Sequence, residues 1–206
     1  LARHFATLRG IASRAALDGG SRAAIEASSA DVEAILRRYR EGVVRITDTV
    51  AALRRMFATR PTAPDVHDLS GIVRAAVEYS GLARRPGIDH WLDLPAPLPF
   101  RCTPTDFHTV FSNLLTNAME AVDEGGVVFV TGRSENGTIR IAVEDNGRGI
   151  PAEHLARVFE PFFSTKAAGN LGIGLTLCRN IVEGYGGTME IDSTEGRRTC
   201  VTVVLP

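Results

Sequence analysis

The sequence predicts an α+β fold in which a helical hairpin precedes a layer of helices on a mainly antiparallel sheet. Apolar residues from Val32 to Phe57 recur by alternating steps of four and three, which is typical of one long helix in a bundle. Beyond residue 60, helical and strand patterns are mixed without the regular βαβ alternation of a parallel sheet. Glu135-Asn136-Gly137 between two strand patterns is a good hairpin signal, which favours antiparallel pairing.

The composition indicates a globular protein without a charge bias. The chain has 206 residues, of which 44% are hydrophobic, enough for one medium domain and a smaller one. With 23 Lys and Arg residues against 24 Asp and Glu, the net charge of -1 gives no electrostatic argument for binding nucleic acid or an anionic membrane. Cys102, Cys178 and Cys200 lack CxxC or metal-ligand spacing, so we expect buried thiols in a reduced compartment.

The chain is expected to be a cytoplasmic fragment of a longer protein. No apolar run approaches the roughly 20 residues that a membrane-spanning helix needs, and no signal segment opens the chain. The sequence begins at Leu1 rather than at a Met, and a helical pattern is already present there. We therefore expect an upstream part to be missing, and the full-length protein could be membrane-anchored.

Residues 1–60 are predicted to form the helical hairpin. Asp18-Gly19-Gly20-Ser21 and Ser28-Ser29 offer breaks and caps, so the bend should fall between residues 18 and 30. Two helices with one apolar stripe each bury little surface alone, so we expect a homodimer that completes a four-helix bundle. The two stripes consist of Leu1, Phe5, Leu8, Ala12 and Ala15, and of Val32, Leu36, Tyr39, Val43, Ile46, Val50, Leu53 and Phe57.

A linker is predicted over residues 61–67 because Pro61 and Pro64 stand among small polar residues, and a second domain is predicted over residues 68–206. Pro104-Thr105-Asp106 is typical of a helix start and leads into a strongly amphipathic helix that ends before Gly125-Gly126. The other predicted elements are helices near 69–77, 152–158 and 173–184, and strands near 88–94, 100–103, 127–131, 138–143, 188–191 and 200–204.

The end of one predicted strand carries the first candidate binding residue. Apolar residues alternate up to Val143, and the strand leads directly to Asp145, followed by Gly147 and Gly149. Two missing β-carbons would let a flat ligand approach the backbone, while the Asp145 carboxylate accepts a hydrogen bond from an exocyclic amine. The alternative for this motif by itself is a tight turn with no ligand.

Two amides form a second candidate group on the predicted long helix. Asn113 and Asn117 stand four residues apart and so project from one face, with Glu120 a turn further on the same side. Amide oxygens suit Mg²⁺, which prefers hard oxygen ligands, and amide N–H groups suit phosphate. Surface amides without a ligand are the alternative.

A glycine-rich loop precedes the last predicted helix, in Gly169-Asn170-Leu171-Gly172-Ile173-Gly174-Leu175. Backbone N–H groups at the start of a helix, together with the helix dipole, form an anion site suited to a triphosphate. Lys166 stands just before the loop and could add a positive charge. The alternatives for the loop alone are a flexible lid or an ordinary helix cap.

Four motifs together resemble the N, first glycine, F and second glycine boxes of bacterial sensor histidine kinases. They are Asn113-Leu-Leu-Thr-Asn117-Ala-Met-Glu-Ala, Asp145-Asn-Gly-Arg-Gly149, Phe159-Glu-Pro-Phe-Phe163-Ser-Thr-Lys166 and Gly172-Ile-Gly-Leu175. The hairpin is similar to the dimerisation and histidine phosphotransfer domain of that family, so the resemblance covers the whole chain. It implies a Bergerat-type α/β sandwich of the GHKL class, which binds ATP and Mg²⁺.

The resemblance also implies roles for particular residues. Asp145 would read adenine, Asn117 would hold Mg²⁺, Asn113 and Glu120 would lie near the phosphates as catalytic residues, and residues 164–172 would form a lid. Asn170 and Arg198 depart from the family pattern, which often has glycine there. The other cofactor-binding residues that it implies are Gly147, Gly149, Ile150, Phe159, Phe163, Lys166, Gly172, Ile173, Gly174, Leu175 and Thr199.

His4 stands where the family has its phosphoacceptor. The implied function is ATP-dependent autophosphorylation of His4, followed by transfer to an aspartate of a response-regulator receiver domain, with a sensor region upstream. The family usually has an acid after this histidine, whereas this chain has Phe5, and no proline follows. A nucleotide-binding adaptor or pseudokinase of the same fold is therefore the alternative. An ATPase of the gyrase, chaperone or mismatch-repair type is disfavoured by the F-box residues and the hairpin.

Overall fold

The computed structural model describes residues 32, 35, 64–165 and 172–206. The chain divides into two compact units, Leu1–Ala51 and Ala52–Pro206. The predicted hairpin and four-helix bundle, the phosphoacceptor His4 and the lid residue Lys166 lie outside the described residues and stay predictions. The following description concerns the second unit.

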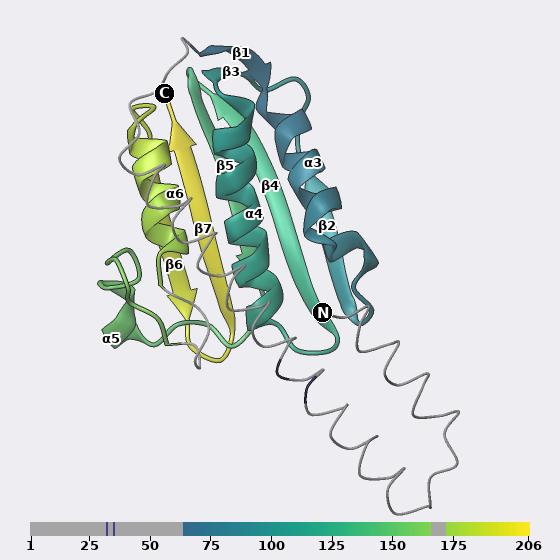
Figure 1. The fold of residues 1–206 in the computed structure, drawn as a ribbon. Helices are drawn as coiled ribbons and strands as arrows, with labels where there is room; N and C mark the ends of the chain where they lie inside the picture. The colour runs from purple at the N-terminus through teal and green to yellow at the C-terminus, as the bar shows by residue number, and fades with distance from the viewer. Residues whose placement is uncertain (1–31, 33–34, 36–63, 166–171) are drawn as a thin grey trace, which may run out of the picture. The chain divides into compact units, whose positions relative to one another are not determined.

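The second unit has two layers, with the helices α3, α4 and α6 on one face of a sheet (Figure 1). The sheet has five strands in the order β2-β4-β5-β7-β6, and only the β2–β4 pair is parallel. This arrangement confirms the predicted layer of helices on a mixed, mainly antiparallel sheet. The elements are α3 (Leu69–Ser80), α4 (Pro104–Ala121), α6 (Gly174–Glu183), β2 (Ile88–Asp93), β4 (Gly126–Glu135), β5 (Thr138–Asp145), β6 (Thr188–Thr194) and β7 (Arg198–Leu205).

Four further short elements lie in the described part of this unit. The strands β1 (Asp65–Asp68) and β3 (Pro99–Cys102) form a two-stranded sheet, and the others are the 3-10 helix η1 (Leu82–Arg84) and α5 (Ala152–Leu155). The strand β1 corrects the linker predicted over 61–67, because residues 65–67 pair with β3. Asp68 then caps α3, since its Oδ1 accepts hydrogen bonds from the backbone N–H groups of Ser70, at 3.0 Å, and Leu98, at 2.8 Å. No helix in the described residues is long and apolar enough to cross a membrane.

The hairpin between β4 and β5 turns where the sequence predicted it. Asn136 and Gly137 have φ values of 52° and 79°, a left-handed pair typical of a two-residue turn. Glu135 pairs directly with Thr138, so β4 continues four residues beyond its predicted end at Thr131. Those last residues are polar and were not recognisable as a strand, because their place in the sheet comes from pairing with β5.

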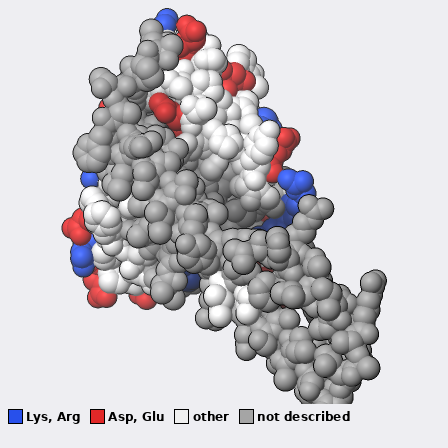
Figure 2. All heavy atoms as spheres, in the orientation of Figure 1, with Lys and Arg blue, Asp and Glu red and all other residues white. Residues whose placement is uncertain are grey.

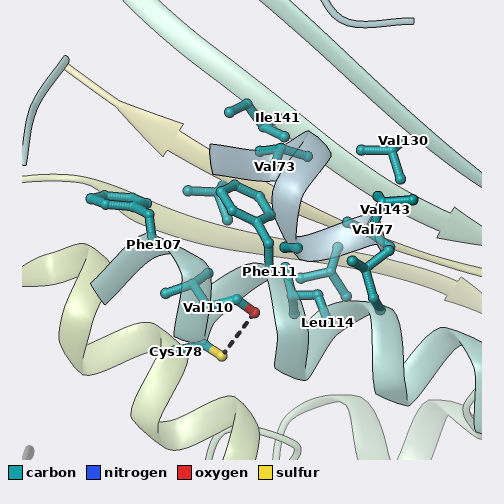
Figure 3. Packing of buried hydrophobic residues seen from close by; sticks show 14 of the residues in the cluster. Val73, Val77, Phe107, Val110, Phe111, Leu114, Val130, Ile141, Val143 and Cys178 are labelled. Atoms are coloured by element: carbon teal, nitrogen blue, oxygen red, sulfur yellow. Dashed lines mark hydrogen bonds between the residues drawn. The ribbon is translucent and has the colours of Figure 1, made fainter. Parts of the chain in front are cut away.

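The core lies between α4 and the sheet (Figure 3). Phe107 and Phe111 of α4 are fully buried there, as the amphipathic pattern predicted. On the other side of α4, the Cys178 Sγ donates to the Val110 carbonyl at 3.6 Å and so joins α6 to α4. Burial raises the pKa of the Cys178 thiol to about 12, which makes it unreactive. All three cysteines are free; Cys102 and Cys178 are buried as predicted, and Cys200 is half-buried.

The described surface carries both signs of charge. Figure 2 shows one face, on which Lys and Arg side chains are interspersed with Asp and Glu side chains around the edge. The described part of this face has no continuous stripe of one sign, in keeping with the nearly neutral sequence.

Core packing can be tested with two phenylalanines of the same unit. Phe111→Ala removes a ring that is 0% exposed, and we expect a loss of about 3–5 kcal/mol in the free energy of unfolding. The matched control is Phe129→Ala on the face of the sheet away from α3, α4 and α6 (Figure 1), where the ring is 39% exposed and the loss should stay below about 1 kcal/mol. Denaturant titration measures both, and equal losses would contradict the assignment of the core to the α4 side.

Candidate functional site

The turn after β5 begins with a buried acid. Successive side chains of β5 point to opposite faces of the sheet, so Asp145 lies on the same face as the buried Val143. Asp145 is only 5% exposed. In the sheet register Asp145 lies opposite Thr199 of β7, which is 7% exposed. The Asp145 Oδ1 accepts a hydrogen bond from the Gly147 N–H at 3.0 Å. The structure therefore places this carboxylate at the end of the strand, as the sequence predicted, and buries it inside the layer.

The surroundings of Asp145 weaken its acidity. Burial is the main cause and raises its pKa from 3.8 to about 6, with a smaller contribution in the same direction from Glu144. The Gly147 N–H bond and the positive charge of Arg148 lower the pKa in part. The carboxylate is thus ionised at neutral pH but poorly solvated, and a ligand that donates a hydrogen bond to it would be favoured.

Glycine is required at two positions of this turn for a reason different from the one the sequence suggested. A Cβ on Gly147 would lie 2.3 Å from the Ala121 carbonyl oxygen, and one on Gly149 would lie 2.2 Å from the Thr194 carbonyl oxygen. Gly149 also has a φ of 66°, which favours glycine. The missing β-carbons therefore face the protein's own backbone, so the glycines allow the turn to pack between the end of α4 and the β6–β7 hairpin.

Backbone hydrogen bonds hold the turn on both sides. The Arg148 N–H donates to the Ala121 carbonyl of α4 at 3.0 Å, and the Arg148 carbonyl accepts from the Gly196 N–H at 2.7 Å. Further on, the Ile150 N–H donates to the Ser193 hydroxyl of β6 at 2.9 Å. Sequence reasoning missed Ser193, because it belongs to no motif and only the strand register brings it to Ile150 and Thr199.

The amides of α4 lie between the two glycine motifs. The Asn113 Nδ2 donates to the Thr109 carbonyl at 2.8 Å, and the Asn113 Oδ1 would be 3.1 Å from a Cβ on Gly174. Asn113 and Asn117 are both half-buried, whereas Glu120 is exposed. One end of this stretch of α4 thus faces the start of α6, and the other end, at Ala121, holds the Asp145 turn.

The segment that contains Phe159 and Phe163 is anchored on α6 and Gly172. The Thr176 hydroxyl donates to the Phe159 carbonyl at 3.0 Å, and the Arg179 guanidinium lies over the Phe159 ring at 5.3 Å. A Cβ on Gly172 would be only 2.4 Å from the Phe163 carbonyl oxygen, so this glycine is also required by close packing.

The Phe163 ring is held by two side chains of its own segment. The Arg157 guanidinium lies 4.4 Å from the ring centroid, and the His154 ring lies at 5.4 Å. The contact with Phe163 gives His154 a packing role.

The second glycine motif opens α6. Ile173 is buried at the N-terminal cap and accepts the first helical bond, from the Leu177 N–H, while the half-buried Leu175 packs against the core. The first turn of a helix leaves backbone N–H groups without helical partners, which suits an anion. Gly174 adds no side chain at this position, next to Asn113.

The described residues hold no dense cluster of acidic, histidine or cysteine side chains that could bind a metal. Within residues 64–165 and 172–206, no three His, Cys, Asp or Glu side chains gather where they could hold a metal ion. The amide of Asn117 and the carboxylate of Glu120 offer hard oxygen donors, which fit Mg²⁺ that keeps most of its ligands from phosphate and water.

The sequence of this domain matches a known family and several bacterial kinases. Residues 102–206 match the family model described as histidine kinase-, DNA gyrase B- and HSP90-like ATPase. The sensor histidine kinase ZraS of Escherichia coli K12 is 41% identical over 103 residues, which are 50% of this chain and 22% of ZraS. The alginate biosynthesis sensor protein KinB of Pseudomonas aeruginosa is 36% identical over 128 residues, or 61% of this chain and 21% of KinB. The chain thus spans about a fifth of the length of these relatives.

Solved structures share the fold. The catalytic domain of the histidine kinase ThkA, in a nucleotide-free form, has a TM-score of 0.64 and 28% identity, and the match covers 70% of this chain and 96% of the ThkA chain. Full-length ShkA in complex with AMPPNP has a TM-score of 0.72 at 22% identity over 99% of this chain and 45% of ShkA, a likeness of fold. The chain belongs to the family of histidine kinase-, DNA gyrase B- and HSP90-like ATPases and contains the ATPase core of a bacterial two-component histidine kinase.

Proposed function

We propose that this chain is the catalytic core of an ATP-dependent autophosphorylating histidine kinase. The domain of residues 68–206 would bind Mg-ATP, and His4 in the predicted dimeric hairpin of residues 1–60 would accept the γ-phosphoryl group. The phosphoryl group then passes to an aspartate of a response-regulator receiver domain. The observation that carries the proposal is the buried Asp145 carboxylate opposite Thr199, joined through α4 to the glycine start of α6.

Adenine recognition is assigned to the Asp145 end of the site. An ionised carboxylate with one hydrogen bond from the protein has acceptor positions left for the exocyclic amine of adenine. Because the carboxylate is buried, this bond forms in a medium of low polarity, where it is stronger than in water. Thr199, beside Asp145 in the register, offers a hydroxyl to the same edge of the base.

The triphosphate is assigned to α4 and the start of α6. Backbone N–H groups of the first turn of α6 would bind phosphate oxygens, and Gly174 keeps that turn open beside Asn113. The Asn117 amide oxygen would hold the Mg²⁺ that accompanies the phosphates, and Asn113 and Glu120 would lie near the phosphates as catalytic residues. Bound there, Mg²⁺ supplies charge neutralisation as the γ-phosphoryl group leaves ADP.

The transfer itself requires little covalent chemistry from the protein. A nitrogen of neutral His4 attacks the γ-phosphorus in line; a nitrogen–phosphorus bond forms as the bond to the bridging oxygen of ADP breaks. The proton on the other ring nitrogen must then leave. Phe5, next in the sequence, cannot accept it, so we propose slow autophosphorylation.

A nucleotide-binding adaptor is the second candidate, and the observation that favours it is the same Phe5 beside His4. The cytoplasmic location, the homodimer, the upstream sensor region and the cognate regulator are likewise proposals. The sensor kinases among the relatives support the kinase over the adaptor.

Asp145→Asn should abolish detectable ATP binding and at the same time stabilise the nucleotide-free protein. The amide still offers an oxygen to the Gly147 N–H, but its NH₂ group opposes the adenine amine. Calorimetric titration with ATP measures the first effect. Binding of ATP by the variant at the wild-type affinity would remove Asp145 from the site.

The stability effect has a defined pH dependence. The folded state raises the Asp145 pKa, so the contribution of this group to stability is present below pH 4 and is lost as the pH rises through about 6. A rise from 3.8 to about 6 corresponds to about 3 kcal/mol. The free energy of unfolding of Asp145→Asn should therefore exceed that of wild type by up to about 3 kcal/mol at pH 8, and the difference should shrink toward pH 4. A pH-independent difference would contradict this assignment.

Asn117→Ala should reduce the Mg²⁺ dependence of binding rather than nucleotide binding itself. ATP affinity measured by calorimetry with Mg²⁺ and with a chelator gives a ratio, which should fall toward one in the variant. Thr116→Ala, an exposed neighbour on α4, is the matched control and should keep the wild-type ratio. A wild-type ratio in Asn117→Ala would show that another group binds the metal.

The Phe5→Glu variant should incorporate radioactive phosphate from ATP at His4 faster than the Phe5→Gln variant, because only glutamate can accept a proton beside His4. General-base assistance is typically worth about 10²- to 10⁴-fold. The glutamine variant controls for the loss of the aromatic side chain, and both variants must remain dimeric. The label should be acid-labile and base-stable, as expected for phosphohistidine. Equal rates in two folded dimers would show that the proton leaves by another route or that His4 is not the phosphoacceptor. Complete absence of label would favour the adaptor.

A further inference from the structure

One row of side chains crosses the sheet at the Asp145 end of the site. The register places Val128 of β4 opposite Asp145, Asp145 opposite Thr199, and Thr199 opposite Ser193 of β6. Asp145 and Thr199 are buried, and Ser193 is half-buried at the end of the row. Three polar side chains thus stand side by side on the face that the helices cover.

The Ser193 hydroxyl has three polar neighbours. It lies 2.9 Å from the Ile150 backbone nitrogen, 2.8 Å from the Arg198 carbonyl oxygen and 3.0 Å from the Thr199 hydroxyl oxygen. The first neighbour can only donate a hydrogen bond, the second can only accept one, and the third can do either.

Only one arrangement of hydrogens satisfies all three contacts. The single Ser193 hydrogen must point at the Arg198 carbonyl, since two oxygens at 2.8 Å without a hydrogen between them would repel. The Ser193 oxygen then accepts from the Ile150 N–H and from the Thr199 hydroxyl. The hydrogen of Thr199 is thereby committed to Ser193, and Thr199 retains only acceptor positions for a ligand.

The result is a pair of acceptors on neighbouring strands. Residues directly opposite in an antiparallel pair have Cβ atoms about 4.5–5.5 Å apart, so one small group can reach both Asp145 and Thr199, directly or through a water molecule. An exocyclic amine has two N–H groups and matches this pair. A 6-oxo group has only acceptors and is opposed by both.

We propose that Ser193 is a positioning residue that sets nucleobase selectivity: it holds the Thr199 hydroxyl as an acceptor, so that the site selects a 6-aminopurine over a 6-oxopurine. The proposal rests on the proposed function, because it takes the Asp145 end as the place of the base. The role of Ser193 is indirect, since its own hydroxyl is saturated by Ile150, Arg198 and Thr199.

The test is the ratio of ATP to ITP affinity, measured by calorimetry on the full chain with Mg²⁺. In Ser193→Ala, the Thr199 hydroxyl can rotate and donate to a 6-oxo group, so ATP binding weakens while ITP binding improves. We expect the ATP-to-ITP ratio to fall about tenfold, as for one hydrogen bond gained or lost. Ser193→Thr keeps a hydroxyl in place and should restore the ratio, whereas a purely structural role would lower both affinities together.

Other outcomes decide against the proposal. Equal weakening of ATP and ITP in Ser193→Ala, with the ratio unchanged, overturns it while the kinase assignment stands. If Ser193→Ala does not fold, Thr199→Val provides the second variant: its ATP affinity should fall, its ITP affinity should not, and an unchanged ratio overturns the proposal. A wild-type chain that binds neither nucleotide overturns both this inference and the proposed function.

Discussion

The buried carboxylate of Asp145 is the constraint on which the rest of this domain depends. The domain keeps an ionised group inside its two layers at neutral pH, and its own structure offers that group a hydrogen bond from Gly147. A buried charge of this kind lowers stability, and a ligand that binds only the folded state compensates for such a loss by mass action. The turn that carries Asp145 packs closely against the protein's own backbone, with Gly147 against α4 and Gly149 against the β6–β7 hairpin.

The helix α4 connects the two ends of the site. Its C-terminal residue Ala121 holds the Asp145 turn, and Asn113, two turns earlier, adjoins the start of α6. At its N-terminal end, Asp106 accepts a hydrogen bond at 2.6 Å from the hydroxyl of Tyr185, just beyond α6. The proposed base site and the proposed phosphate site would therefore keep a fixed separation along this helix. Of the lid predicted over residues 164–172, residues 166–171 lie outside the described part of the chain.

Local patterns, formed by residues close together in the sequence, predicted local structure. Contacts that depend on the register between strands could not be predicted. The alternation before Asp145 predicted the strand β5 and the position of the acid at its end, and the spacing of Asn113 and Asn117 predicted a shared stretch of helix. The strand β1 was missed because its four residues, Asp-Val-His-Asp, show no apolar alternation and pair only with the distant β3. Ser193 was missed for the same reason, since its position beside Thr199 and Ile150 follows from the sheet alone.

The most direct measurement is the pKa of Asp145 itself. Carboxyl carbon NMR can measure it in the free protein and in the protein saturated with ATP. The free protein should titrate near pH 6, because burial dominates the surroundings of this group. With ATP bound, the amine N–H would favour the ionised form, and the pKa should fall well below that value. An Asp145 pKa that does not change when ATP saturates the protein would contradict the central claim that this carboxylate binds the base.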